Sequence, residues 1–203
     1  MSNPSENAFE DHIADWLATK GGFDAVKPGP AGSQDLDADT GLDTAELMAF
    51  IGQTQGAEWD RLCEGFQDPA EAQQAFKARL SEQIDKRGTV DVLRNGITYA
   101  ETSYNLSFDL AYFRPAADLN PDLNAKYQSN RVTCTRQLMY ESDSKKSLDL
   151  ATFVNGIPVV TVELKNILTG QNVNNAIQQY STDRDASNPL LRRSVVHLSL
   201  IHI

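Results

Sequence analysis

The chain has 203 residues, of which 40% are hydrophobic and 23% charged, and its formal net charge is −10 at pH 7. These values are typical of a soluble globular protein with one sizeable core, and no apolar run approaches the roughly 18–20 residues that a membrane span requires. The acidic balance argues against a broad DNA-coating surface, which needs clustered Lys and Arg, but it does not exclude a nuclease whose active-site carboxylates bind metal.

The cysteines and the N-terminus both indicate where in the cell the protein works. Cys63 and Cys134 lie far apart in the sequence and have no metal-ligand spacing, so we interpret both as small buried apolar residues in a reducing compartment. The N-terminus is polar and acidic, which is not typical of a secretory signal. The sequence therefore predicts a cytoplasmic protein.

The first predicted element is a helix from Pro4 to Lys20, which ends at two glycines. Its apolar stripe has helical spacing, and Glu10 borders that stripe instead of facing away from it. The stripe consists of Phe9, Ile13, Trp16 and Leu17.

Two further helices begin at capping sequences. Asp43, with Glu46 three residues later, predicts a helix that ends near Thr54. Asp68, followed by proline at the first helical position, predicts a long helix that ends near Arg87. A shorter helix is predicted around residues 57–65, and these helices are expected to pack as a helical part beside a sheet.

The run from Asp35 to Glu46 resembles a calcium-binding loop in the spacing of its acidic residues. Position 6 of such a loop needs glycine for a sharp turn, and Thr40 occupies it here. No helix is predicted to enter the run, because the preceding residues are rich in glycine and proline. The sequence therefore favours an acidic loop that runs into a helix cap over a calcium site.

After Gly96 the sequence favours strands. We predict an α/β (α+β) fold in a single domain, with a helical part at about residues 1–96 and a sheet core at about residues 97–203. The predicted elements are an alternating strand over 106–112, a strand over 131–140, two strands around Asn155-Gly156, a helix over 173–184 and a strand from Ser194 onward.

The two strands around Asn155-Gly156 carry the main chemical signal. This dipeptide readily adopts positive φ and favours a tight hairpin, which would bring Asp149 back beside Glu163 and Lys165. Leu148 and Leu150 are expected to point away from the face of Asp149. Carboxylates bind Mg²⁺, and a nearby lysine can orient the attacking water in phosphodiester hydrolysis. The alternative is an ordinary hairpin with solvated polar residues.

A resemblance to a known family favours the first interpretation. In order along the chain, five segments closely resemble the N-terminal nuclease region of the motor (R) subunit of type I restriction enzymes, a member of the PD-(D/E)xK nucleases. The resemblance extends from about Phe9 to His197. The segments are VDVLRNGI, NRVTCTRQLMY, SLDLATFVNGIPVVTVELKN, TGQNVNNAIQQYSTDRD and NPLLRRSVVH.

The resemblance implies a restriction-endonuclease-like core, in which a mixed central sheet is flanked by helices. It assigns Asp149 and Glu163 as the ligands of a catalytic Mg²⁺ and Lys165 as the residue that steadies the attacking water and the scissile phosphate. The backbone carbonyl of Leu164 is a further candidate ligand.

Accessory residues follow from the same resemblance. Relatives often add a glutamate from an early helix, for which we choose Glu10, with Glu6 as the alternate. Many also carry Gln-x-x-x-Tyr on the helix after Glu-x-Lys. Here Ala176 stands four residues before Tyr180, so Gln179 and Tyr180 are only the nearest equivalents.

In this family the complete subunit uses ATP to translocate DNA and works with methylation and specificity subunits on double-stranded DNA. The present chain has no phosphate-binding loop motif and is expected to be a truncated piece that does not itself bind ATP. Its last residues, 198–203, depart from the family pattern. Two alternatives remain open: a repair or junction nuclease of the same superfamily, and a non-catalytic docking module of a DNA motor.

Overall fold

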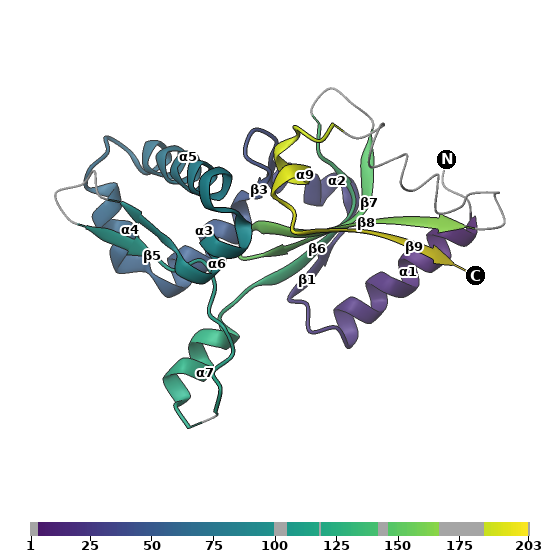
Figure 1. Ribbon diagram of the computed structural model, residues 1–203, viewed down its shortest axis with the longest axis horizontal. Helices are drawn as coiled ribbons and strands as arrows, with labels where there is room; N and C mark the ends of the chain where they lie inside the picture. The colour runs from purple at the N-terminus through teal and green to yellow at the C-terminus, as the bar shows by residue number, and fades with distance from the viewer. Residues whose placement is uncertain (1–3, 100–104, 118, 142–145, 167–184, 203) are drawn as a thin grey trace.

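The computed structural model describes residues 4–99, 105–117, 119–141, 146–166 and 185–202 (Figure 1). Its helices are α1 (Pro4–Thr19), α2 (Gly29–Gly32), α3 (Thr44–Thr54), α4 (Gly56–Cys63), α5 (Pro69–Arg87), α6 (Thr89–Asn95), α7 (Pro121–Gln128) and α9 (Pro189–Arg193), with a 3₁₀ turn η1 (Ser33–Asp35). Its strands are β1 (Ala25–Lys27), β2 (Leu36–Asp37), β3 (Leu42–Asp43), β4 (Ile97–Tyr99), β5 (Leu106–Phe108), β6 (Val132–Met139), β7 (Ser147–Val154), β8 (Ile157–Asn166) and β9 (Val196–His202).

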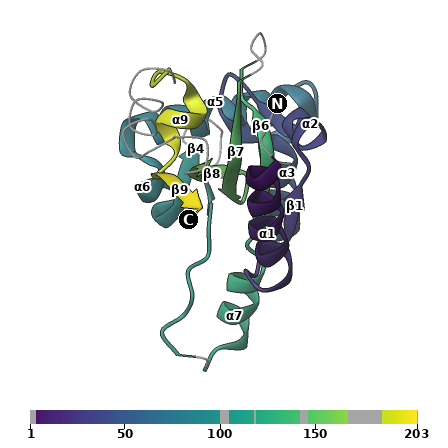
Figure 2. The same cartoon turned by 90° about the vertical axis from the view of Figure 1, so that its right-hand side faces the viewer.

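A mixed five-stranded sheet forms the centre of the molecule, in the order β1-β6-β7-β8-β9. The outer pairs, β1 with β6 and β8 with β9, are parallel, and the inner pairs are antiparallel. Helix α1 covers one face and α9 lies on the other (Figure 2). The α+β class with a mixed sheet flanked by helices is confirmed.

The predicted hairpin between β7 and β8 is present. Asn155 and Gly156 both have positive φ, at 51° and 78°, as a two-residue turn between twisted strands requires. A Cβ on Gly156 would lie 2.3 Å from the carbonyl oxygen of Asp43, so this turn packs directly against the start of α3. The Asn155 side chain accepts a hydrogen bond from the Arg131 backbone and donates one to the Leu110 carbonyl. The turn is therefore held by contacts with the start of α3, with Leu110 and with Arg131, which precedes β6.

Helix α1 is rotated relative to its predicted stripe. Trp16 is 51% exposed, whereas Glu10 is only 4% exposed and Ala14 is buried. At about 100° per residue, the buried face is centred between Ile13 and Ala14, which puts Trp16 outside it. The prediction that Trp16 belongs to the buried stripe was wrong, and the prediction that Glu10 borders it is confirmed.

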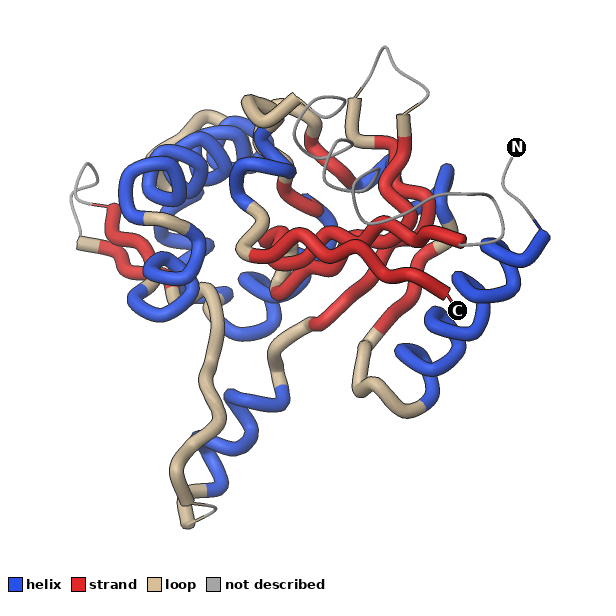
Figure 3. Tube along the Cα trace, turned by 45° about the vertical axis from the view of Figure 1, so that its right-hand side comes forward, coloured by secondary structure: helices blue, strands red, loops and turns tan. Residues whose placement is uncertain are grey.

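The helical part has its own apolar core. Helices α3 to α6 and the β4–β5 hairpin gather at one end of the molecule (Figures 1 and 3). Of the residues that the structure describes, sixteen buried ones form one cluster there, around Phe50, Phe76 and Phe108. The predicted caps are present, since the side chains of Asp43 and Asp68 accept hydrogen bonds from the amides three residues later.

The strand predicted over 106–112 is shorter than expected and does not join the main sheet. Only β5 forms, and it pairs with β4. The Gln55 side chain bonds to both the amide and the carbonyl of Asp109, which supplies the partners that a strand ladder would otherwise provide. Conversely, α1 and β1 lie within the residues predicted as the helical part, about 1–96, but they pack with the five-stranded sheet.

Other differences are local. Helix α7 was not predicted, although Asn120 caps it and Pro121 begins it, and it projects from the body of the molecule (Figure 3). Cys134 is buried, and burial raises the pKa of its thiol to about 12, whereas Cys63 is only half-buried. None of the described helices is long and apolar enough to cross a membrane.

Candidate active site

The β7–β8 pair brings Asp149 next to the Glu-Leu-Lys segment. The two strands pair in the register Leu150↔Val162, which places Asp149 opposite Glu163. The backbone amide of Leu164, the next residue, donates a 2.6 Å hydrogen bond to Asp149 Oδ2. Asp149 and Glu163 are therefore neighbours across the two strands, as the hairpin predicted.

A third strand supplies the partner of the other Asp149 oxygen. The side-chain amide nitrogen of Gln137, on β6, donates to Asp149 Oδ1 at 3.2 Å and to Glu10 Oε2 at 2.6 Å. The amide oxygen of Gln137 accepts from the Ser147 hydroxyl at 3.1 Å. One neutral amide thus joins the predicted metal ligand Asp149 to Glu10 of α1.

Arg136 binds the other carboxylate oxygen of Glu10. Its Nε donates to Glu10 Oε1 at 2.7 Å, and its terminal nitrogen bonds to Asp11. Burial lowers the pKa of the Arg136 guanidinium, but the hydrogen bonds to the two carboxylates outweigh this effect and the pKa is raised. Glu10 therefore has a cationic partner on one oxygen and a neutral partner on the other.

Burial of charge marks this end of the sheet. Glu163 is 2% exposed and Glu10 is 4% exposed, and acidic side chains are rarely buried to this extent unless they are paired or bind a metal. Glu163 lies on β8 between Val162 and Leu164, which pack toward α1, and it is in register with Ser199 of β9.

The environment of Asp149 differs from the prediction in one respect. Leu148 packs with Leu138 in a cluster that includes α9 residues, whereas Leu150 packs with Cys134 in the cluster below α1. The two leucines therefore do not share a face, contrary to the expectation. Opposite Asp149 on the neighbouring strand, Gln137 has a φ of 43°.

One family of known proteins matches the chain. Residues 67–201 match the family described as Type I restriction enzyme R protein N terminus (HSDR_N). The chain belongs to this family. No curated protein and no solved structure shows a significant match to it.

The family region contains Gln137, Asp149, Glu163 and Lys165, whereas Glu10 lies before it. Lys165 is the ninth residue of β8, and its backbone is in register with Ile201 of β9. Its side chain lies outside the part of the structure that is described. Gln179 and Tyr180 also lie outside the described residues, so their predicted roles stay predictions, as does that of Glu6.

The donor set in this R protein N-terminal region suits a hard divalent cation. Mg²⁺ is commonly held by only one or two protein carboxylates and keeps several waters. Among the described residues, Asp149 Oδ1 accepts a hydrogen bond from Gln137 and Oδ2 accepts one from the Leu164 amide, and a carboxylate oxygen has two lone pairs. Glu163 is the cross-strand neighbour of Asp149. Among the described residues no group of three His, Cys, Asp or Glu side chains is placed to hold a metal, and the assignment of Asp149 and Glu163 as Mg²⁺ ligands stays a prediction.

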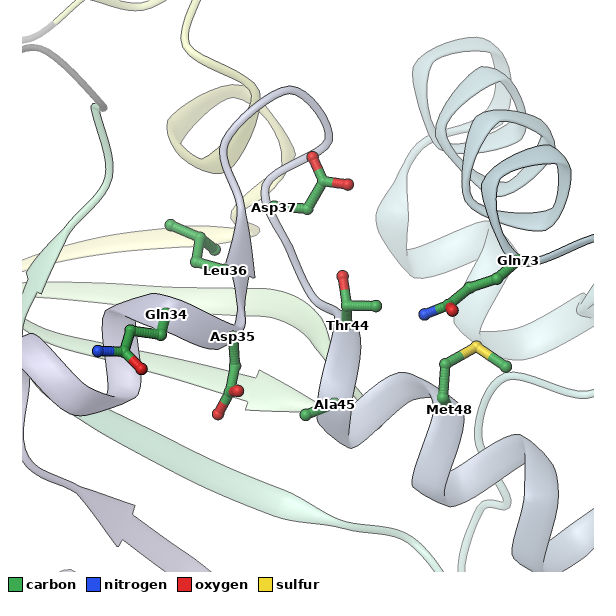
Figure 4. Close-up of a pocket in the computed structure, with 8 residues that line it drawn as sticks. All are labelled: Gln34, Asp35, Leu36, Asp37, Thr44, Ala45, Met48 and Gln73. Carbon is green, nitrogen blue, oxygen red and sulfur yellow. The ribbon is translucent and has the colours of Figure 1, made fainter. Parts of the chain in front are cut away.

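The acidic run from Asp35 to Glu46 has a structural role, as predicted. Lys27 Nζ contacts Asp35, Asp43 and Glu46 at 2.7–3.1 Å. Asp35 and Asp37 point in opposite directions at the edge of a pocket of about 440 Å³ (Figure 4). Because the carboxylates of Asp35, Asp43 and Glu46 converge on the ammonium group of Lys27 and Asp37 points away from Asp35, the structure offers no calcium loop here.

Gln137 and Arg136 are the site residues that the sequence prediction missed. They lie side by side within an otherwise β-forming segment, and a pair of polar residues in the middle of a strand is the only local signal. Their contacts with α1 span more than 120 positions of the sequence. Motif spacing in the sequence cannot predict contacts between residues so far apart.

Proposed function

We propose that this chain is the Mg²⁺-dependent endonuclease module of a type I restriction enzyme R subunit and that it hydrolyses DNA phosphodiester bonds. The observation that carries the proposal is the hydrogen bond from Leu164 N to Asp149 Oδ2, which orients the Asp149 carboxylate beside Glu163 in a region that matches the family. Membership of the family supports action on DNA within a multi-subunit enzyme.

In the proposed mechanism, Asp149 and Glu163 hold the cation. When it is bound, Mg²⁺ makes the attacking water more acidic and neutralises negative charge on the phosphate. The amide of Leu164 keeps Asp149 in one orientation, so that little reorganisation is needed when the substrate arrives. Lys165 donates hydrogen bonds to the attacking water and to a non-bridging oxygen of the scissile phosphate, and it stabilises the charge that develops there.

In the complete subunit, cleavage would be coupled to ATP-driven translocation carried out by other domains, together with methylation and specificity subunits. The 203 residues would not bind ATP themselves. DNA contacts would come from the later part of the chain, where the basic residues lie, because the first third is strongly acidic. The Asp149, Glu163 and Lys165 set weighs against a purely docking role, which has no use for it.

Two substitutions distinguish the role of Glu163 as a metal ligand from the role of Lys165 in catalysis. Glu163→Ala removes a metal ligand, so Mn²⁺ binding and plasmid cutting should fall together. Lys165→Ala removes a positive charge near the cation but no ligand, so Mn²⁺ should bind at least as well as in the parent. Cutting should still fall by about 10²–10⁴-fold, because the water and phosphate lose a positioned donor.

Plasmid cutting, ATPase activity and Mn²⁺ binding are measured side by side in the R subunit reconstituted with its partner subunits. Lys86→Ala is the matched control, because Lys86 is an exposed lysine of α5 in the helical part. It should leave all three readouts unchanged, and ATPase activity should survive in every variant. Near-normal cutting by Glu163→Ala or Lys165→Ala would show that the active site lies elsewhere.

A further inference from the structure

Gln137 interrupts strand β6 at the candidate site. Its φ of 43° lies in the left-handed region, which a residue other than glycine seldom adopts. Arg136 pairs with Leu150, and Leu138 pairs with Leu148, on either side of the interruption. The irregular residue therefore lies opposite Asp149, and such outliers persist only where the surrounding structure enforces them.

The segment that follows β1 enforces this conformation. A Cβ on Gly29, at the start of α2, would lie 3.0 Å from the Cβ of Gln137 and 3.0 Å from the carbonyl oxygen of Arg136. Two residues beyond Gln137, the amide of Met139 donates to the hydroxyl of Ser33 at 3.0 Å. The backbone of this part of β6 is thus enclosed by α2 and η1.

The Gln137 amide is oriented by all of its contacts. Its nitrogen donates to the carboxylates of Glu10 and Asp149, and its oxygen accepts from the Ser147 hydroxyl. The reverse orientation would place the amide oxygen against two carboxylates, which repel it. The hydrogen bonds therefore define one orientation, in which the donor group lies between the two acidic side chains.

The chemistry of an amide explains why glutamine suits this position. A lysine or arginine would neutralise the two carboxylates and compete with an incoming cation, whereas an amide joins them and leaves their charge in place. We infer that Gln137 is a positioning residue, which ties Asp149 to Glu10 of α1 and so holds the Asp149 carboxylate in place for a divalent cation shared with Glu163. This inference rests on the proposed function and adds to it a residue from a third strand.

Two substitutions test the inference in the full chain, with Mn²⁺ alone as the probe. Gln137→Met keeps the length of the side chain but removes both hydrogen bonds to the carboxylates. Loss of such an outer-shell partner typically lowers metal affinity about 10–100-fold, and we expect a loss in this range. Gln137→Lys places a cation between Glu10 and Asp149, so the protein should fold but bind Mn²⁺ even more weakly than Gln137→Met.

Gln55→Met is the matched control. Gln55 also joins two groups through its amide, since it bonds to the carbonyl and the amide of Asp109 at 2.9 and 2.7 Å, but it lies in the helical part. It should lower thermal stability and leave Mn²⁺ affinity unchanged. Affinities are compared at a temperature at which circular dichroism shows all variants to be folded.

The outcomes separate the two proposals. If Asp149→Ala abolishes Mn²⁺ binding but Gln137→Met and Gln137→Lys bind as the parent does, the inference about Gln137 is overturned and the proposed function stands. If the parent itself shows no Mn²⁺ binding that depends on Asp149, both are overturned. Weaker binding by both Gln137 variants, with parent-like binding by Gln55→Met, is the result that the inference predicts.

Discussion

Two groups of carboxylates in this molecule are held together by different kinds of partner. One group lies at or beside the short β2–β3 hairpin and surrounds the ammonium group of Lys27; we call its members the hairpin carboxylates. The other group shares the neutral amide of Gln137, and we call its members the site carboxylates. The hairpin carboxylates are Asp35, Asp43 and Glu46, and the site carboxylates are Glu10 and Asp149.

This difference separates a structural group from a functional one. Burial lowers the pKa of the Lys27 ammonium, but hydrogen bonds to Asp43 and Glu46 outweigh burial and raise it, so the hairpin carboxylates have a permanent cation. Of the site carboxylates, Glu10 pairs with Arg136, whereas the described partners of Asp149 are the neutral amides of Gln137 and Leu164. A group that holds its own cation stabilises the fold, and a group joined by an amide can accept a cation from solution.

The largest effect on stability is expected from Lys27→Met. The substitution leaves the buried Asp43 without Lys27, whereas Glu46 keeps its ion pair with Arg131 at 2.6 Å. Removal of one partner from a buried ion pair typically costs about 3–5 kcal/mol. We expect the free energy of unfolding, measured by urea denaturation, to fall by about 3 kcal/mol. The exposed Lys86→Met should change it by less than about 0.5 kcal/mol. Equal effects for the two lysines would mean that the hairpin carboxylates do not need Lys27.

A smaller and pH-dependent effect is expected from Asp37→Asn. Burial raises the pKa of Asp37, but the hydrogen bond and charge of Lys77 outweigh it, so the pKa is lowered from 3.8. A lowered folded-state pKa gives stability that is fully present above the unfolded pKa and is lost as the pH falls through the folded value. The substitution should therefore destabilise the protein at pH 7 and do so less at pH 3.

The measurement is urea denaturation of parent and Asp37→Asn at both pH values. Asparagine keeps the side-chain oxygen that accepts hydrogen bonds from the amides of Asp39 and Thr40, so the substitution mainly removes the charge. A difference in stability that is the same at pH 7 and pH 3 would contradict the assignment of this effect to the ion pair with Lys77.

Much of the fold could be predicted because its signals are local. Asn155-Gly156 specifies the hairpin, Asp43 and Asp68 specify helix starts, and the apolar run after Ser194 forms β9. Strand β1 was missed because three residues carry too little pattern, and its pairing with β6 depends on contacts far away in the sequence. The rotation of α1 that exposes Trp16 also depends on what the helix packs against.

In the candidate site, too, local signals could be predicted and contacts between distant segments could not. Asp149 and Glu163 could be placed together, because a two-residue turn fixes the register of the strands that carry them. Glu10 could be named from its helical position but not located. Gln137 could not be predicted as a bridge, because its role comes from an irregular backbone enclosed by α2.

The central claim is that a divalent cation binds at Asp149 and its cross-strand neighbour Glu163 and not at the hairpin carboxylates. Titration of the chain with Mn²⁺, followed by electron paramagnetic resonance, tests this directly in the parent, Asp149→Ala and Asp35→Asn. We predict that Asp149→Ala weakens binding by more than the roughly 10–100-fold typical of an outer-shell change and that Asp35→Asn binds as the parent does. Binding that survives in Asp149→Ala and is lost in Asp35→Asn would contradict the claim.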